Sequence, residues 1–307
     1  MQAIRIHEFG APEVLTLEEV ATPRPGPGQV LLRNHAAGVN PVDYKIRQGK
    51  YPRIRAEQLP MILGRDAAGV VERSEDRRHP PGQEVFALLD WTLGGYAEYV
   101  VLDGAACVEK PRSLSQREAG AVPLAALTAW QGLFDQGALR AGQRVLIHAG
   151  AGGVGHFAVQ FARARGAEVY TTVSGAHCAL VRDLGAAVAI DYRTQRFEDI
   201  VRDADLVFDL VGGETRERSF GVLKRGGMLV STLGQPDEKL AAQYGVRVAG
   251  YMAEPNPGEL AEIGRLLEAG QVRVLLSQAF PLARAADAHR CLEERHPPGK
   301  VVLAVAD

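Results

Sequence analysis

The spacing of hydrophobic residues changes twice along this chain, near residue 118 and near residue 270. Before residue 118, apolar and polar residues alternate in short runs separated by turn residues, which is typical of half-buried strands. Residues 3–6, 14–20 and 96–101 are examples. Between residues 118 and 270, short apolar runs alternate with helical spacing, and this order predicts a doubly wound parallel sheet. A predicted helix over 283–294 and a predicted strand over 300–305 then resume the first pattern.

We therefore predict an α/β protein with two domains. The first part of a β-rich domain covers residues 1–117, a nucleotide-binding domain covers 118–270, and 271–307 return to the β-rich domain. Six strands are expected in the parallel sheet, at residues 145–147, 168–173, 187–191, 206–209, 228–231 and 246–250.

A glycine-rich turn follows the first of these strands and leads into a segment with apolar residues at helical spacing. This order of strand, turn and helix is typical of a dinucleotide site, where Gly150 permits the turn and Gly152 lets backbone approach a pyrophosphate. Gly155 allows the helix to pack on the strand, and the helix N-terminus favours the anion. The residues predicted to hold the pyrophosphate are Gly150, Ala151, Gly152, Gly153, Val154 and Gly155.

The end of the second strand indicates which dinucleotide is bound. An NAD site places a carboxylate there to bind the ribose 2′-hydroxyl, whereas this chain has Ser174 and His177 and no carboxylate before Asp183. Tyr192 and Arg193 end the next strand. Hydroxyl and imidazole groups donate to a 2′-phosphate, so we expect NADP(H); the alternative is that Ser174 and His177 are only turn residues.

Composition narrows the class of protein. A length of 307 residues suits two domains, and a net charge of −2 gives no reason to expect nucleic acid or an anionic membrane as a partner. No membrane-spanning stretch or signal-peptide core is found. Cys107, Cys178 and Cys291 are scattered and form no metal or disulfide pattern. A cytoplasmic location fits this usage.

Several segments in the right order resemble the medium-chain dehydrogenase/reductase superfamily, in particular its zinc-free quinone oxidoreductases. The matching segments are residues 38–49, 60–71, 122–130, 208–213, 230–234 and 299–303. The resemblance implies a GroES-like catalytic domain, a Rossmann NADP(H)-binding domain and a homodimer. It also implies cofactor contacts, which fall on Asn40, Thr128, Leu210, Val211, Leu233 and Gly234.

Zinc-dependent relatives differ from this chain at two places. They carry a cysteine where it has Asn40-Pro41, and Gly-His-Glu where it has Gly64-Arg65-Asp66. A catalytic zinc needs three protein ligands, and Asp66 alone cannot provide them. We therefore expect no metal, and zinc-type oxidation of simple alcohols becomes improbable.

Two residues are candidates for catalysis. The Asn40 amide would donate to a ribose or substrate oxygen, and its alternative role is to cap a turn. The Tyr44 phenol would orient the substrate or relay a proton, although a surface helix with a local ion pair explains it equally well. We read Arg65 and Asp66 as a structural pair, His148 as structural and Lys300 as the start of a strand.

These observations predict an NADPH-dependent reductase of quinones or α,β-unsaturated carbonyl compounds. Hydrogen-bond donors would stabilise the developing oxygen charge, and the proton would come from water. One alternative is an NADPH-binding protein with a structural or regulatory role, and a weaker one is a zinc alcohol dehydrogenase. Neither the individual substrate nor the oligomeric state follows from the sequence.

Overall fold

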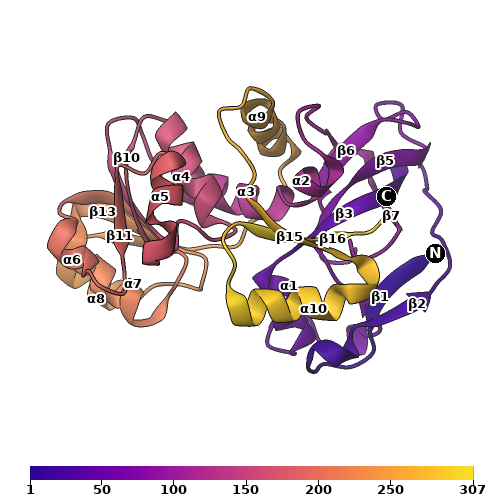
Figure 1. The fold of residues 1–307 in the computed structure, drawn as a ribbon, viewed down its shortest axis with the longest axis horizontal. Helices are drawn as coiled ribbons and strands as arrows, with labels where there is room; N and C mark the ends of the chain where they lie inside the picture. Colours follow the sequence, from indigo (N-terminus) through magenta and orange to yellow (C-terminus); the bar gives the residue numbers. More distant parts are fainter. Residues whose placement is uncertain (307) are drawn as a thin grey trace. The chain divides into compact units, whose positions relative to one another are not determined.

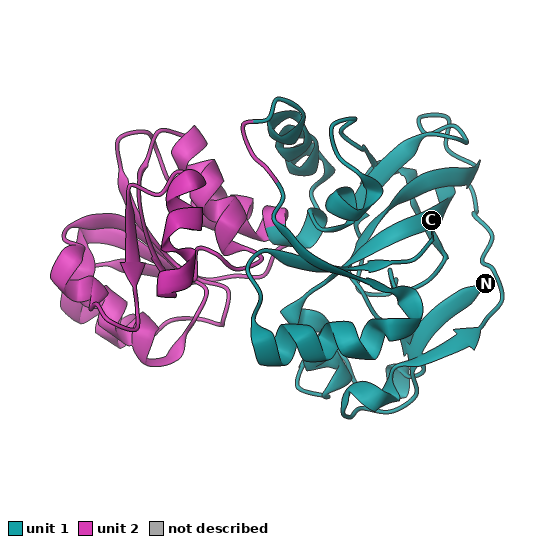
Figure 2. Ribbon diagram, in the orientation of Figure 1, with its two compact units in different colours: residues 1–125, 255–270, 274–307 teal, residues 126–254, 271–273 magenta. Residues whose placement is uncertain are grey.

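The computed structural model describes residues 1–306, which divide into two compact units (Figure 2). Unit 1 contains residues 1–125, 255–270 and those from 274 onward, and unit 2 contains 126–254 and 271–273. The sequence had been divided after residue 117 and after residue 270. Residues 255–270 lie in unit 1 because they include a helix that packs beside Pro111 and is tied to the same loop by Ser113, whose backbone N–H donates to Glu268 at 3.0 Å.

Unit 1 contains two sheets (Figure 1). Three strands pair in the order β2-β1-β4, and a larger sheet has the order β15-β16-β3-β5-β6-β8 with β7 also paired to β3. The strands are β1 (Gln2–Ile6), β2 (Thr16–Glu19), β3 (Gln29–Val39), β4 (Met61–Ile62), β5 (Asp66–Ser74), β6 (Glu84–Leu88), β7 (Tyr99–Asp103), β8 (Val108–Glu109), β15 (Leu276–Pro281) and β16 (Lys300–Ala304). The helices are α1 (Pro41–Arg47), α2 (Gln116–Gly120), α9 (Pro257–Glu268) and α10 (Ala285–Arg290).

The last strand of the chain returns to the first large strand of unit 1. β16 pairs antiparallel with β3, so Val301 faces Val39 and Leu303 faces Ala37. All four side chains belong to one buried apolar cluster, which explains why the predicted closing strand ends here. The pairing places Lys300 beside the end of β3. This strand ends at Val39, and Asn40 is the next residue.

Unit 2 is built on one parallel sheet with helices on its faces. Its order, β11-β10-β9-β12-β13-β14, corresponds to the 3-2-1-4-5-6 order of a doubly wound dinucleotide fold, so the predicted fold class is confirmed. The strands are β9 (Arg144–His148), β10 (Glu168–Val173), β11 (Val188–Asp191), β12 (Ala204–Asp209), β13 (Leu223–Ser231) and β14 (Arg247–Gly250). The helices are α4 (Gly155–Ala164), α5 (Cys178–Asp183), α6 (Phe197–Ile200), α7 (Gly213–Ser219) and α8 (Glu238–Tyr244), and α3 (Pro123–Trp130) includes the division between the units.

The central strands of unit 2 are apolar because both of their faces are covered. Leu146 of β9 lies next to Val207 of β12, which lies next to Leu229 of β13, and all three are completely buried. Such rows across adjacent strands specify the register, since a shift by one residue would move each side chain to the other face.

Some predicted elements differ from the observed ones. The predicted strand over residues 14–20 is a 3₁₀ turn, Pro12–Val14, followed by β2. The predicted helix over 283–294 consists of α10 and a π-helical segment, Cys291–Arg295. Among the described residues, no helix has both the length and the apolar character needed to cross a bilayer.

Candidate functional site

The glycine turn between β9 and α4 contains two glycines that the packing itself requires. A Cβ on Gly150 would lie 2.0 Å from Thr171 Oγ1, and one on Gly155 would lie 2.1 Å from the Ala149 carbonyl oxygen. The positive φ in this turn belongs to Ala149, at 56°, and not to Gly150. Gly150 is therefore required by its close approach to β10, whereas the sequence had suggested the turn conformation as the reason.

Gly152 differs from its two neighbours. The only atom within 4 Å of a Cβ built on it is the Ala149 carbonyl oxygen, at 3.2 Å, so the fold has little need of a glycine here. Gly152 lies before the first turn of α4 and is partly exposed, as are Gly153 and Val154, whereas Ala151 is buried. A site that needs close approach of a phosphate to backbone, at a helix N-terminus, accounts for a glycine that packing does not require.

The end of β10 brings the two predicted recognition residues together. Ser174 Oγ lies 3.1 Å from His177 Nδ1, and Tyr192, at the end of the adjacent strand β11, is 58% exposed. The sequence reasoning missed Asp191, whose Oδ2 would lie 2.6 Å from a Cβ on Gly175. Asp191 accepts hydrogen bonds from the Arg193 backbone N–H and the Thr194 hydroxyl, so its carboxylate shapes the turn after β11.

A buried carboxylate holds the loops that follow β12 and β13. Asp209 Oδ1 accepts from the backbone N–H of Val211 at 3.0 Å and of Gly212 at 2.8 Å, and its Oδ2 accepts from Ser231 Oγ at 2.8 Å. Ser231 Oγ in turn accepts from the Leu233 backbone N–H at 3.1 Å. This network positions the four residues expected to cover the cofactor: Leu210, Val211, Leu233 and Gly234.

Thr128 and His148 have well-defined surroundings in unit 2. The backbone carbonyl of Thr128 accepts a hydrogen bond from the Tyr251 hydroxyl, which ties α3 to the segment after β14. His148 is completely buried between Thr172 Oγ1, at 3.0 Å, and Ser219 Oγ, at 2.8 Å. Burial lowers the pKa of His148 to about 4, so this imidazole is neutral near pH 7 and its role is structural.

Asn40 follows the last residue of β3 and is the N-cap of α1 in unit 1. Its backbone N–H donates to Asp43 Oδ2 at 2.8 Å, and Pro41 occupies the first position of the helix, where no backbone donor is needed. The side-chain amide is buried at 3% exposure. Asn40 therefore occupies the N-cap position, but the side chain that bonds there is that of Asp43, and the Asn40 amide is used elsewhere.

The amide of Asn40 is held between two buried charges. Its Nδ2 donates to Asp66 Oδ2 at 2.8 Å and makes a longer contact of 3.4 Å with the Gly38 carbonyl oxygen, while Lys300 Nζ donates to its Oδ1. Lys300 Nζ and Asp66 Oδ2 are 3.9 Å apart, and both side chains are at most 3% exposed. Burial lowers the pKa of Lys300, and Asp66 opposes that shift. Both Nδ2 hydrogens therefore have an acceptor, and the bond to Gly38 is the longer of the two.

Lys300 begins β16, as predicted, and the structure adds the partners of Arg65, Asp66 and Lys300. Asp66 is bound by Asn40, Lys300 and the Leu124 backbone N–H, at 2.6 Å, whereas the Arg65 Nε donates to the Leu89 carbonyl oxygen at 2.7 Å. Arg65 and Asp66 are both buried and structural, as predicted, and Asp66 acts on Arg65 electrostatically, but their hydrogen bonds go to different partners. From the sequence, Lys300 could be recognised only as the start of a strand, because Asp66, its buried charged partner, is far away in the chain.

Asp43 begins a second buried network. Tyr96 donates to Asp43 Oδ2 at 2.9 Å, and the Tyr96 hydroxyl lies 3.2 Å from His289 Nε2. Because Tyr96 donates its proton to Asp43, His289 must donate through Nε2, and its Nδ1 faces Arg47 at 3.5 Å. Burial and the Arg47 charge lower the pKa of His289 to about 3, and burial raises the pKa of Asp43 to about 7.

Tyr44 lies on α1 and is partly buried. Burial and the Glu293 carboxylate raise the pKa of its phenol above the usual value, so Tyr44 is protonated near neutral pH and is able to donate a hydrogen bond. Its neighbour Asp43, the acidic residue available for a local ion pair on this helix, is completely buried and belongs to the Tyr96 network, so an ion pair on a surface helix does not explain α1.

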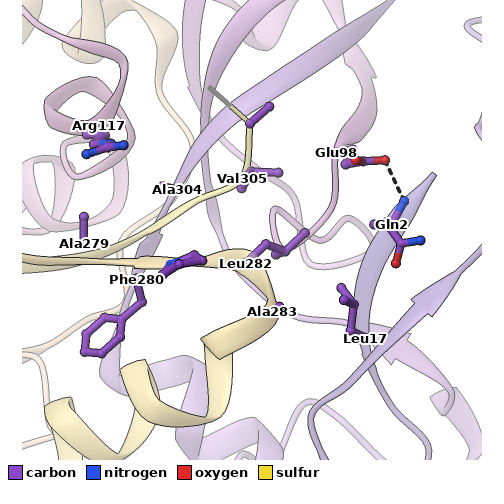
Figure 3. Close-up of a pocket in the computed structure, with 12 residues that line it drawn as sticks. Gln2, Leu17, Glu98, Arg117, Ala279, Phe280, Leu282, Ala283, Ala304 and Val305 are labelled. Atoms are coloured by element: carbon purple, nitrogen blue, oxygen red, sulfur yellow. Dashed lines mark hydrogen bonds between the residues drawn. The ribbon is translucent and has the colours of Figure 1, made fainter.

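Unit 1 also contains a cavity of about 530 Å³ near the first and last strands (Figure 3). Phe280, Leu282 and Val305 contribute apolar surface, and Glu98 on its border accepts a hydrogen bond from the Gln2 backbone N–H at 2.7 Å. None of the lining residues is a candidate site residue. The cavity therefore adds nothing to the candidate chemistry.

Comparisons with protein families match two parts of the chain. The alcohol dehydrogenase GroES-like domain matches residues 26–112, and the zinc-binding dehydrogenase family matches residues 184–303. Quinone oxidoreductase of Pseudomonas aeruginosa is 35% identical, over 98% of each chain. The chloroplastic NADPH-dependent alkenal/one oxidoreductase of Arabidopsis thaliana is 34% identical, over 99% of this chain and 79% of the relative.

Solved structures give the same likeness. Quinone oxidoreductase from Coxiella burnetii is 36% identical and has a TM-score of 0.91, over 100% of this chain and 99% of the other. The Escherichia coli quinone oxidoreductase, solved in complex with NADPH, is 29% identical and has a TM-score of 0.90, over 99% of this chain and 100% of the other.

The side chains present do not suit the zinc ion that one family description mentions. Within residues 1–306, no three His, Cys, Asp or Glu side chains gather into a possible metal site. Where zinc-dependent relatives carry ligands, this chain has the amide of Asn40 and the guanidinium of Arg65, with the Lys300 ammonium bound to that amide. Two buried cations disfavour a divalent ion, so no step is assigned to zinc.

Proposed function

Because this chain belongs to the medium-chain dehydrogenase/reductase superfamily and is similar to its quinone oxidoreductases, we propose that it is an NADPH-dependent reductase of quinones or α,β-unsaturated carbonyl compounds. Membership of this oxidoreductase family supports the general class of reaction. The substrate class is supported by two relatives, named as a quinone oxidoreductase and an alkenal/one oxidoreductase. The observation that carries the proposal is Gly152, the glycine that packing does not require.

We infer that unit 2 binds NADP(H). The open backbone at Gly152 and the N-terminus of α4 suit a pyrophosphate, and the network of Asp209 supports the loops at the ends of β12 and β13. Ser174 and His177 supply a hydroxyl and an imidazole at the end of β10, where an NAD site carries a carboxylate. The related Escherichia coli enzyme was solved with NADPH bound.

Bound NADPH would supply the hydride for reduction, and the chain supplies donors for the oxygen that gains charge. Lys300 and Asp66 fix the plane of the Asn40 amide, and a substrate oxygen would replace the Gly38 carbonyl oxygen as the acceptor of its second Nδ2 hydrogen, which now makes a bond of 3.4 Å. The protonated Tyr44 phenol is the second donor. We assign Asn40 and Tyr44 to the oxygen of the substrate or the cofactor ribose, and the proton to water.

An NADPH-oxidation screen over quinones, enones and enals tests this function. The enzyme should consume NADPH with at least one of these classes, and treatment with a chelator should leave the rate unchanged. NADPH binding without oxidation in any class would favour the structural or regulatory alternative. Activity lost on chelation and restored by zinc would contradict the metal-free site.

Asn40→Ala tests the residue that we place at the reacting centre. The variant removes a donor from the developing oxygen, so kcat should fall more than NADPH affinity does. Steady-state rates and calorimetric NADPH titration measure the two effects, and Asn34→Ala, also in β3 but bound to the Gly95 and Ala97 carbonyls, is the control for damage to the fold. Unchanged kcat in Asn40→Ala would remove Asn40 from the mechanism.

We also propose that the protein is a cytoplasmic homodimer. The family resemblance suggests the dimer, and three free cysteines fit a reducing compartment. Light scattering should give twice the 33.0 kDa mass of one chain, and a mass of one chain would contradict the assignment.

A further inference from the structure

Arg65 has a buried guanidinium whose terminal nitrogens lack partners. The residue is 3% exposed, and its Nε donates to the Leu89 carbonyl oxygen at 2.7 Å. The guanidinium carbon lies 3.5 Å from the centre of the Trp91 ring. This stacking satisfies the face of the guanidinium, but NH1 and NH2 are buried without a hydrogen-bond acceptor. A buried cation with unsatisfied donors is costly, so an acceptor is expected beside it.

Two more polar atoms without partners lie close to Arg65. Asp43 is completely buried, and its Oδ1 has no hydrogen-bond partner although its Oδ2 has two. The indole Nε1 of Trp91 is also buried without a partner. The unpaired groups are thus a carboxylate oxygen, a guanidinium and an indole N–H. One small polar ligand between them would satisfy their hydrogen bonds.

A small cavity of about 10 Å³ joins these residues. Asp43, Arg65 and Trp91 line it, and Ile46, Leu63 and Leu93 close it with apolar surface. A single water molecule needs about this much space, and no organic ligand fits in it. The occupant must accept from the guanidinium and donate to the carboxylate. Water does both, whereas a halide would face the carboxylate and a metal ion would face the guanidinium.

We propose that this cavity is a binding site for one internal water molecule, which bridges the Arg65 guanidinium and Asp43 Oδ1. Arg65 is then a positioning residue for Asp43. Through the water, its positive charge stabilises the ionised carboxylate, whose other oxygen holds the backbone N–H of Asn40 at the start of α1. This inference stands independently of the proposed reductase activity, because it rests on the packing of unit 1 alone.

The charges around Asp43 come from several elements. The N-cap of its own helix contributes the Asn40 N–H, and β16 contributes Lys300. Asp66 comes from the start of β5 and Arg65 from the residue before it. The segment before β7 contributes the Tyr96 hydroxyl, which contacts His289 of α10. Burial and Asp66 favour the neutral carboxyl, while the two hydrogen bonds and Lys300 favour the charged form, and the pKa of Asp43 is about 7. Removing the Arg65 charge should therefore move the titration of Asp43 to higher pH.

Trp91 provides a reporter for this titration. The chain has two tryptophans, so Trp130→Phe in unit 2 leaves Trp91 as the only one. In that background, Trp91 fluorescence between pH 5 and 9 should show one transition near pH 7. Asp43→Asn should abolish it, whereas Asp90→Asn should retain it, because Asp90 is an exposed carboxylate that accepts from the Trp91 backbone N–H. A transition that survives in Asp43→Asn would overturn the proposal.

The role of Arg65 and the water are tested separately. Arg65→Met should raise the midpoint by about one pH unit or more, and Arg65→Lys, which retains the charge, should show a smaller shift. Equal midpoints in both variants and the parent would refute the positioning role. A high-resolution crystal structure of the unmodified protein should show one water within about 3 Å of both Asp43 Oδ1 and an Arg65 terminal nitrogen. A direct contact between these side chains, or a cavity without that water, would refute the site.

Discussion

The two glycines at the start of α4 should respond to substitution in opposite ways. In Gly155→Ala, the new Cβ would lie 2.1 Å from the Ala149 carbonyl oxygen, more than 1 Å closer than the 3.4 Å at which ordinary contact begins. In Gly152→Val, the same carbonyl oxygen lies 3.2 Å from the Cβ and nothing else lies within 4 Å. Packing should therefore suffer in Gly155→Ala, whereas in Gly152→Val the added side chain occupies the expected position of the pyrophosphate.

The expected magnitudes separate the two effects. Overpacking typically costs about 1–3 kcal/mol, so Gly155→Ala should unfold at a temperature several degrees below that of the parent. Gly152→Val should lose less of its Tm than Gly155→Ala, but its Kd for NADPH should rise at least tenfold, equivalent to about 1.4 kcal/mol. The loss should be smaller because the Cβ of residue 152 lies 3.2 Å from the Ala149 oxygen and no positive φ adds backbone strain.

Calorimetric titration with NADPH and thermal unfolding without ligand measure the two quantities on the same preparations. Gly142→Ala is a control for unit 2, since this glycine lies in a different turn. Its positive φ should make it slightly less stable, but its NADPH affinity should be that of the parent. An unchanged Kd in Gly152→Val would refute the pyrophosphate site. A loss of Tm in Gly152→Val equal to that in Gly155→Ala would refute the steric argument.

Three further predictions concern specificity, pH and buried charge. Ser174→Asp should weaken NADPH by roughly tenfold and NADH by less, measured as two Kd values, and an equal loss for both would contradict the 2′-phosphate assignment. His148 has a folded pKa lowered by burial to about 4, below its unfolded value, so wild-type stability should fall as pH drops from about 6.5 to 4, by up to about 1.4 kcal/mol per unit. Urea unfolding should show that His148→Gln is less destabilising at pH 5 than at pH 7, and an identical loss at both pH values would contradict the neutral buried imidazole. Lys300→Met leaves the Asp66 carboxylate buried without its cation and should cost about 3–5 kcal/mol in urea unfolding, while Lys300→Gln, which retains a donor, should cost less; equal losses would show that the Asn40–Lys300 contact is unimportant.

The sequence alone was sufficient to predict the parallel sheet of unit 2 and the glycine-rich turn after its first strand. Those elements are encoded by neighbouring residues, because a strand buried on both faces needs a continuous apolar run and a helix that packs on it needs apolar residues every three or four positions. The packing role of Gly155 could also be predicted from local order. The need for a glycine at position 150 has a cause that could not be predicted in this way, because the Thr171 side chain that approaches it belongs to a different strand.

The polar networks of unit 1 required the tertiary structure. Asn40 and Asp43 are close in sequence, and their capping contact follows from local spacing. The partners of these residues, Asp66, Tyr96 and Lys300, come from three distant segments, and strand pairing alone brings them within hydrogen-bond distance. Hydrophobic periodicity specifies which face of an element is buried, but it carries no information about which distant polar group is opposite. Only the completed sheet decides that Lys300 binds Asn40 and that Arg65 faces Trp91.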